Sequence, residues 1–340
     1  MKKQLIYFFF SILLPLLLLT GCGQNTYVTG LYAPTTSSET PYPRTVENYH
    51  ASGAPVSYTY TKVPQRVVIT HPSATELFLE LGLENHILST VPPYSAPLPR
   101  LAEKYKQLSI MKAQYAPSQE ELLAMSPDMI IGWSHHFTDN QLGSVSSWHQ
   151  RRIPTFIMQS TLFFVEPTLE SAVYACISDI GKIFAITEKT NAYIRQMKSR
   201  VSQVQASLKD IPKKKSLIVL QNHGNGQFSL YGRSSLISHL ISLAGGQNLC
   251  ELPVSFVGAE KILLYDPDYV IYIPYTTNSF YDYSQEEAIQ QLQSLRGLQN
   301  IPSIKEGRII PLPFTSVNDG GLRAVDTIET IAHQLYPNAF

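Results

Sequence analysis

Cysteine is scarce in this chain of 340 residues, which contains only three: Cys22, Cys176 and Cys250. Three cysteines cannot form a disulfide framework or a four-cysteine zinc site, so the folded part has to be stabilised by a packed core. The composition permits such a core, because 44% of the residues are hydrophobic. We expect Cys176 and Cys250 to be two separate buried thiols, and a disulfide between them is the alternative.

The chain also lacks an excess of charge of either sign, since 26 Lys and Arg residues balance 26 Asp and Glu residues. It has no long basic run, which argues against nucleic acid as a partner. Several catalytic and metal-site motifs are missing, namely H-E-x-x-H, C-x-x-C, Walker A, G-x-S-x-G and a G-x-G-x-x-G after a predicted strand. The sequence therefore predicts neither an enzyme nor a metal site.

One long apolar run is present, and it lies at the N-terminus. Lys2 and Lys3 precede apolar residues 5–19, and Leu19-Thr20-Gly21-Cys22 follows. The run is short for a membrane span and has no basic stop after it, so residues 1–21 are predicted to be a secretory signal peptide. Small residues directly before a cysteine resemble the bacterial lipobox, which implies a lipidated Cys22 and an extracytoplasmic protein anchored to the membrane. An uncleaved helix anchor is the alternative.

Residues 22–43 are rich in Thr, Ser, Pro and Tyr and have almost no aliphatic periodicity, so we predict a flexible tether. Further along, residues 187–209 contain no Gly and no Pro. Apolar side chains recur there at helical spacing, at Met197, Val201 and Val204. This pattern predicts one long helix over residues 187–211, with about half of the folded chain on each side.

The two flanks of this helix repeat each other. Glu120 begins a helical stretch that ends in Pro127-Asp128 and an apolar strand, and Glu260 begins one that ends in Pro267-Asp268 and a strand. Strands alternate with helices throughout both flanks. We therefore predict an α/β fold of two lobes, residues 44–186 and 212–340, each a parallel sheet flanked by helices. The alternative is that a common α/β joint occurs twice by chance.

Ligands of parallel α/β sheets bind beyond the carboxyl ends of the strands, and aromatic side chains gather after the predicted strands. They suit a cleft for a large, flat small molecule, although some could be rim packing. Arg233 and Arg323 would suit an anionic ligand such as a ferric catecholate or a propionate. His135 and His136 are adjacent and cannot easily share one metal ion, but a single His or Tyr as an axial haem ligand remains open.

An ordered series of short motifs from about residue 44 to residue 340 resembles the iron-complex and cobalamin solute-binding proteins of ABC importers, which include siderophore-, vitamin B12- and haem-binding members. The motifs are Val63-Pro64-Gln65-Arg66-Val67-Val68, Ser73-Ala74-Thr75-Glu76, Leu81-Gly82, Pro117-Ser118-Gln119-Glu120, Ser126-Pro127-Asp128, Leu243-Ala244-Gly245-Gly246-Gln247-Asn248, Lys305-Glu306-Gly307-Arg308 and Leu335-Tyr336-Pro337.

The resemblance implies a class III periplasmic-binding-protein-like fold, with one rigid helix bridging the lobes. It implies a small-molecule metal chelate bound between the lobes, with no cofactor, and delivery to an ABC permease dimer with its ATPase by a monomer. A ferric siderophore is our first choice, and cobalamin or haem is the alternative. A surface sensor module or a hydrolase remains as an alternative of another class.

The resemblance also assigns residues. The family's ligand positions correspond to Tyr94, Trp133, Arg233 and Arg323, and more loosely to His71, Tyr275 and Phe314. Its permease-docking carboxylates correspond to Glu120 and Glu260. From the residues alone, each of these two carboxylates would also stabilise a helix N-terminus, by about 0.3–1 kcal/mol.

Overall fold

The computed structural model describes residues 42–113, 115–162, 166–276, 278, 283–317 and 321–340. Residues 39–340 belong to one compact unit. The predicted signal peptide, Cys22 and nearly all of the predicted tether lie outside the described residues. Within the described part of the chain, no helix combines the length and apolar character that a membrane span requires.

The described chain begins with an antiparallel hairpin. Strand β1 (Arg44–Tyr49) pairs with β2 (Pro55–Tyr60), as the alternating pattern before and after the Ala51-Ser52-Gly53 turn leads one to expect. The side chain of Asn48 fixes the hairpin to the neighbouring sheet, because its amide donates to the Ile157 carbonyl at 3.1 Å and accepts from the Ile157 amide at 2.7 Å.

The first lobe contains a four-stranded, entirely parallel sheet in the order β4-β3-β5-β6. Its strands are apolar and mostly buried, as expected where helices cover both faces of a parallel sheet. The strands are β3 (Val67–Ile69), β4 (Ile87–Thr90), β5 (Met129–Gly132) and β6 (Thr155–Ile157). The helices are α1 (Pro72–Glu80), α2 (Ala102–Lys106), α3 (Gln119–Met125), α4 (Val145–Gln150) and α5 (Ala175–Ile183), with a π-helical segment, Leu169–Tyr174, directly before α5.

The second lobe contains a six-stranded sheet in the order β10-β8-β7-β11-β12, with β9 pairing to β7. Strands β7, β11 and β12 are parallel, as predicted. Strand β9, which was not predicted, is also parallel to β7, whereas β8 and β10 extend the sheet in antiparallel fashion. The strands are β7 (Lys215–Asn222), β8 (Phe228–Leu230), β9 (Gly246–Asn248), β10 (Val254–Val257), β11 (Tyr269–Ile273) and β12 (Ile309–Pro311). The helices are α7 (Leu236–Leu243), α8 (Ala259–Ile262), α9 (Gln285–Ser294), α10 (Pro302–Lys305), α11 (Phe314–Val317) and α12 (Arg323–Leu335).

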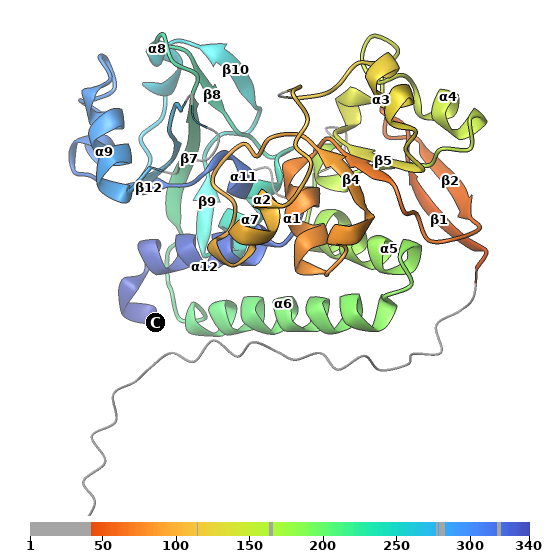
Figure 1. Cartoon of the computed structure of the whole chain (residues 1–340). Helices are drawn as coiled ribbons and strands as arrows, with labels where there is room; N and C mark the ends of the chain where they lie inside the picture. The colour runs from red at the N-terminus through yellow and green to blue at the C-terminus, as the bar shows by residue number, and fades with distance from the viewer. Residues whose placement is uncertain (1–41, 114, 163–165, 277, 279–282, 318–320) are drawn as a thin grey trace, which may run out of the picture. The chain divides into compact units, whose positions relative to one another are not determined.

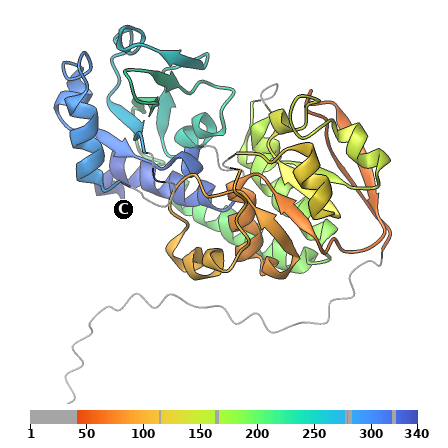
Figure 2. The ribbon, with the colours of Figure 1, turned by 45° about the horizontal axis from the view of Figure 1, so that its top comes forward.

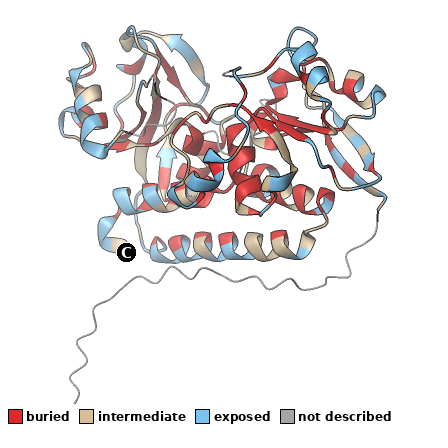
Figure 3. Ribbon diagram, viewed as in Figure 1, coloured by how far each residue is buried: buried red, intermediate tan, exposed pale blue. Residues whose placement is uncertain are grey.

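The predicted long helix is α6 (Thr187–Ser207), which has 21 residues. It contacts α5 of the first lobe and α7 and α12 of the second, and Figure 1 shows it below α5 and α12 at the bottom of the view. Its inner face is buried at Met197, Val201 and Val204, while its outer face is exposed (Figure 3). Close packing on α5 requires Gly181, since a Cβ there would lie 2.1 Å from Thr190 Oγ1.

The Pro-Asp repeat performs the same structural task in both lobes. Asp128 precedes β5 and accepts hydrogen bonds from the amides of Gln65 and Arg66, at 2.8 and 2.7 Å, just before β3. Asp268 precedes β11 and accepts from the amide of Ser216 in β7 at 2.8 Å. Each carboxylate therefore fixes the start of the strand that pairs with its own, so the repeat follows from equivalent positions in two similar sheets.

Candidate functional site

A cleft of about 1330 Å³ lies beyond the carboxyl ends of the strands, and both lobes contribute to it. The two lobes are seen from a second direction in Figure 2. From the first lobe the lining residues are Tyr94, Tyr115, Ala116, Pro117, Ser118, Gln119, Glu120, Trp133, His135, His136, Asp139, Asn140 and Gln141. From the second they are Gln221, Asn222, His223, Phe256, Ile273, Pro274, Tyr275, Thr276 and Phe314. A cleft of this volume suits a bulky small-molecule ligand rather than a single ion.

Aromatic rings from both lobes meet on the cleft lining, just beyond the carboxyl ends of the strands. Tyr94 follows β4, Trp133 follows β5 and Phe314 follows β12. The Tyr94 ring centroid lies 5.8 Å from that of Phe314 and 6.3 Å from that of Trp133. These three predicted residues are therefore brought together at the cleft. Burial raises the pKa of Tyr94, so its phenol stays protonated at neutral pH and can donate a hydrogen bond.

His71 lies behind this aromatic group rather than on the cleft lining. Its ring stacks on that of Trp133 with centroids 4.3 Å apart, and its side chain is 1% exposed. Neither ring nitrogen has a hydrogen-bond partner among the described residues. Burial, together with His136 and His135 nearby, lowers the pKa of His71 to about 3, so the ring is neutral. His71 supports Trp133 and does not itself face the cleft.

The neighbouring histidines do line the cleft. His136 is buried, and its Nδ1 lies 3.0 Å from Thr70 Oγ1, while His135 is exposed. Burial lowers the pKa of both, that of His136 to about 3 with a contribution from His135. Both rings are therefore neutral at pH 7 and can donate or accept hydrogen bonds. Among the described residues, no three His, Cys, Asp or Glu side chains are placed to hold a metal ion.

A second aromatic wall comes from the other lobe. His223 follows β7 and stacks on Phe256 of β10, with ring centroids 4.6 Å apart and an interplanar angle of 28°. Tyr275 follows β11 and packs over Gly224, where a Cβ would lie 3.2 Å from the Tyr275 ring. The predicted Tyr275 thus lines the cleft. Two aromatic side chains that were not predicted also line it, Phe256 on this lobe and Tyr115 on the opposite lobe.

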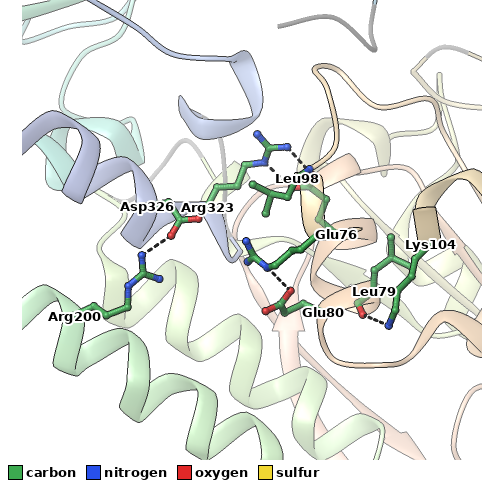
Figure 4. A network of polar contacts seen from close by, with 9 residues as sticks. Glu76, Leu79, Glu80, Leu98, Lys104, Arg200, Arg323 and Asp326 are labelled. Carbon is green, nitrogen blue, oxygen red and sulfur yellow. Dashed lines mark hydrogen bonds and ion pairs between the residues drawn. The ribbon is translucent and has the colours of Figure 1, made fainter. Parts of the chain in front are cut away.

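The two predicted arginines are placed elsewhere. Arg233 is exposed and pairs with Glu251, with Nε 2.7 Å from Oε2. Arg323 is buried and pairs with Glu76 of the first lobe (Figure 4). Neither lines the cleft, so ligand contact by Arg233 and Arg323 does not follow from this geometry. The charged residues of the described lining are instead Glu120 and Asp139, which are both carboxylates.

Glu120 and Glu260 occupy equivalent places in the two lobes. Each is exposed in the first turn of a helix, α3 or α8, two residues after the N-cap. The α3 start has a capping box: the Ser118 amide donates to the Glu121 carboxylate at 2.7 Å, and the Glu121 amide donates to the Ser118 hydroxyl at 3.2 Å. A carboxylate at this position stabilises the helix end and still points into solvent. Their docking role remains a prediction.

Cys176 and Cys250 are both buried and no disulfide joins them, so the expectation of two separate buried thiols is confirmed. Phe256 escaped notice because β10 has only four residues, of which none is buried, so it carries no core pattern. Tyr115 follows no strand, so its place on the cleft could not be predicted from topology. The sequence feature that could have pointed to it is its position three residues before Ser118, the N-cap of α3.

Known proteins resemble this chain over most of its length. An uncharacterized ABC transporter substrate-binding lipoprotein of Bacillus subtilis, YvrC, is 20% identical over 333 residues, covering 97% of this chain and 96% of its own. A periplasmic binding protein from Veillonella parvula has 20% identity and a TM-score of 0.74, covering 87% of this chain and 99% of its own. A structure titled as an ABC-type Fe3+-hydroxamate transport system from Saccharomonospora viridis has 18% identity and a TM-score of 0.69, covering 86% and 99%.

These likenesses agree with the fold and with the resemblance noted in the sequence. The family described as periplasmic binding protein matches residues 67–315, which is well over half of the chain. The chain therefore belongs to the periplasmic binding protein family.

Proposed function

We propose that this protein is the extracytoplasmic, lipid-anchored solute-binding component of an ABC importer. It captures an iron complex in the cleft between the lobes and delivers it to a permease. The observation that carries the proposal is the cleft of about 1330 Å³, lined by aromatic rings from both lobes at the carboxyl ends of their strands. The Bacillus subtilis relative, named as an ABC transporter substrate-binding lipoprotein, supports the transport role.

Among iron complexes, a ferric siderophore is the preferred ligand, and haem or cobalamin is the alternative. The proposed contacts are Tyr94, Trp133, Tyr275 and Phe314, with neutral imidazoles beside them. Because Glu120 and Asp139 are the charged lining residues, a neutral or cationic complex is favoured over an anionic one. Three singly deprotonated hydroxamates neutralise Fe(III), and the Saccharomonospora viridis relative is titled as an Fe3+-hydroxamate system. A neutral ferric hydroxamate therefore fits best.

The proposal includes binding without turnover. No residue of the cleft is assigned a catalytic role, and the aromatic walls provide contact area for a ligand that leaves unchanged. Lipidation of Cys22 would hold the protein at the membrane, where one acyl chain is marginal and two or more anchor stably.

The test is a titration of the soluble form that begins after Cys22. Ferric hydroxamates, ferric catecholates, haem and cobalamins are added while Trp fluorescence is followed, because Trp133 faces the cleft and the chain has only two Trp. We expect saturable quenching by one class and recovery of the ligand unchanged. Trp133→Ala is measured by a method that does not depend on fluorescence, and should weaken binding at least tenfold. Absence of binding across the panel would overturn the iron-complex assignment.

A further inference from the structure

Phe256 is held in a backbone conformation that its side chain disfavours. Its φ is +55°, in the left-handed region, where a bulky residue other than glycine is an outlier. The side chain is 64% exposed and lies outside the buried cores of the described chain, so core packing does not compensate for the strain. Strain retained without burial points to a functional role for the side chain.

The conformation has an identifiable cause in the sheet. In the antiparallel pairing of β10 with β8, Val254 lies opposite Leu230 and Val257 opposite Phe228. Two residues of β10, Ser255 and Phe256, therefore oppose the single residue Ser229. This is a β-bulge, which bends a strand and turns a side chain away from the regular alternation, often beside a binding site.

The bulge places the Phe256 ring on the cleft lining and against His223, with the two rings stacked 4.6 Å apart. His223 is itself held in place, since its Nε2 lies 2.7 Å from the hydroxyl oxygen of Ser229, the residue opposite the bulge. The three residues thus form one unit, in which the β8–β10 pairing orients both rings.

We propose that the Phe256–His223 pair is the stacking surface by which the second lobe holds an aromatic group of the bound complex. This inference rests on the proposed function, that the cleft binds an iron complex. An offset-stacked aromatic contact contributes specificity beyond its buried area, and two stacked rings present a larger and more rigid face than one. The pair therefore selects ligands that carry a planar aromatic group.

The decisive variant is Phe256→Gly. Glycine adopts φ of +55° without steric cost, so this change removes the ring and relieves the backbone strain together. We expect the melting temperature to be unchanged or higher while affinity for an aromatic complex falls about tenfold. A residue with a merely structural role would lower the melting temperature instead. Leu252→Ala is the matched control, because Leu252 is 78% exposed in the same segment and does not line the cleft.

The probes are iron(III) tris(benzohydroxamate) and iron(III) tris(acetohydroxamate), which have the same donor atoms and charge and differ by phenyl against methyl. Wild type should prefer the phenyl complex, and Phe256→Gly should lower that preference about tenfold while Leu252→Ala retains it. If wild type shows no preference, or Phe256→Gly retains it, the stacking surface is wrong while the proposed function stands. If wild type binds neither probe nor any complex of the wider panel, the proposed function itself is wrong.

Discussion

Arg323 and Glu76 form a buried, bidentate ion pair that joins the two lobes. Arg323 donates from Nε to Glu76 Oε2 at 2.7 Å and from Nη2 to Oε1 at 2.6 Å, and the two side chains are 6% and 4% exposed (Figure 4). Arg323 comes from α12 and Glu76 from α1. Paired charges and two fixed hydrogen bonds at this place resist sliding of one lobe on the other.

The same pair holds the loop that carries Tyr94. Arg323 also donates to the carbonyl of Ala96 at 2.7 Å, and Glu76 accepts from the amide of Leu98 at 3.0 Å. Between these anchors and Tyr94, Ser95 contacts Thr315 of the second lobe, next to Phe314. Arg323 therefore acts on the cleft through the loop, without touching the ligand.

The first prediction concerns this pair. Glu76→Leu or Arg323→Met alone leaves one buried charge without its partner and should lower the free energy of unfolding by about 3–5 kcal/mol. The double variant should lose much less than the sum, because both charges are gone. Denaturant titrations of the two single variants and the double variant measure this coupling.

Arg233→Ala is the control for the same chemistry at the surface. Its pair with Glu251 is exposed, with 62% of each side chain accessible, so Arg233→Ala should lower the free energy of unfolding by only about 0–1 kcal/mol. Strictly additive losses in Glu76→Leu and Arg323→Met would show that the buried pair has no coupling of its own.

The architecture could be predicted from the sequence because its signals are local. The stretch 187–209 lacks Gly and Pro and has the apolar period of a helix, which predicts α6, and the Pro-Asp repeat marks two equivalent strand starts, at β5 and β11. Strands β8, β9 and β10 escaped prediction. Strand β10 contains no buried residue and β9 contains one, so neither carries the apolar pattern of a core strand.

The site could be predicted only in part, for a physical reason. Aromatic residues that follow parallel strands, such as Tyr94 and Trp133, must lie at one edge of a sheet, so their place follows from topology. The partner of an arginine does not follow from local pattern. Arg323 and Glu76 are 247 positions apart, and their pairing depends on how the folded chain places α12 relative to α1.

The second prediction concerns ligand charge. A neutral ferric tris(hydroxamate) should bind more tightly than a trianionic ferric tris(catecholate) of similar size, by at least about tenfold at low salt, because Glu120 and Asp139 repel anions. The difference in affinity between the two complexes should become smaller as salt is raised, since these exposed charges are screened within about 10 Å at 0.1 M. Competition titrations at several salt concentrations measure it.

Asp139→Asn should strengthen catecholate binding and leave hydroxamate binding unchanged. Asp266→Asn is the matched control, because Asp266 is exposed and lies outside the cleft lining. Equal affinity for the two complexes at low salt would contradict an acidic cleft.

The third prediction concerns pH and stability. The pKa of buried His71 and of His136 is lowered to about 3, against about 6.5 in the unfolded chain. Between these values the unfolded chain binds more protons, so the stability that is full above pH 6.5 is lost as pH falls. In this pH range each histidine lowers the free energy of unfolding by about 1.4 kcal/mol for every pH unit that the pH falls. The variant His71→Leu should remove the contribution of one histidine to this pH dependence between pH 6 and 4. Denaturant unfolding at several pH values measures it.

Val68→Ala serves as the control for His71→Leu. It removes buried apolar atoms from β3 of the same sheet and should lower stability equally at every pH. If the free energy of unfolding changes with pH as steeply in His71→Leu as in wild type, His71 does not resist protonation in the folded protein.

The last prediction separates docking from helix stabilisation at Glu120 and Glu260. The double variant Glu120→Ala with Glu260→Ala should abolish import in cells, while the purified protein still binds its iron complex. The reason is that both carboxylates are exposed, one on each lobe, at positions where basic residues of a permease dimer could reach them. Uptake of radioactive iron complex and ligand titration of the same variant measure the two properties separately.

Glu286→Ala is the matched control, because Glu286 is also exposed and also lies two residues after an N-cap, at the start of α9. Loss of any one of these three carboxylates should cost about 0.3–1 kcal/mol of helix stabilisation. If Glu286→Ala lowers import as much as the double variant does, stability explains the effect and the docking role is wrong. If import stops only when Glu120 and Glu260 are changed, and that variant still binds its iron complex, the two exposed carboxylates act on the partner, because their contribution to the helices is matched.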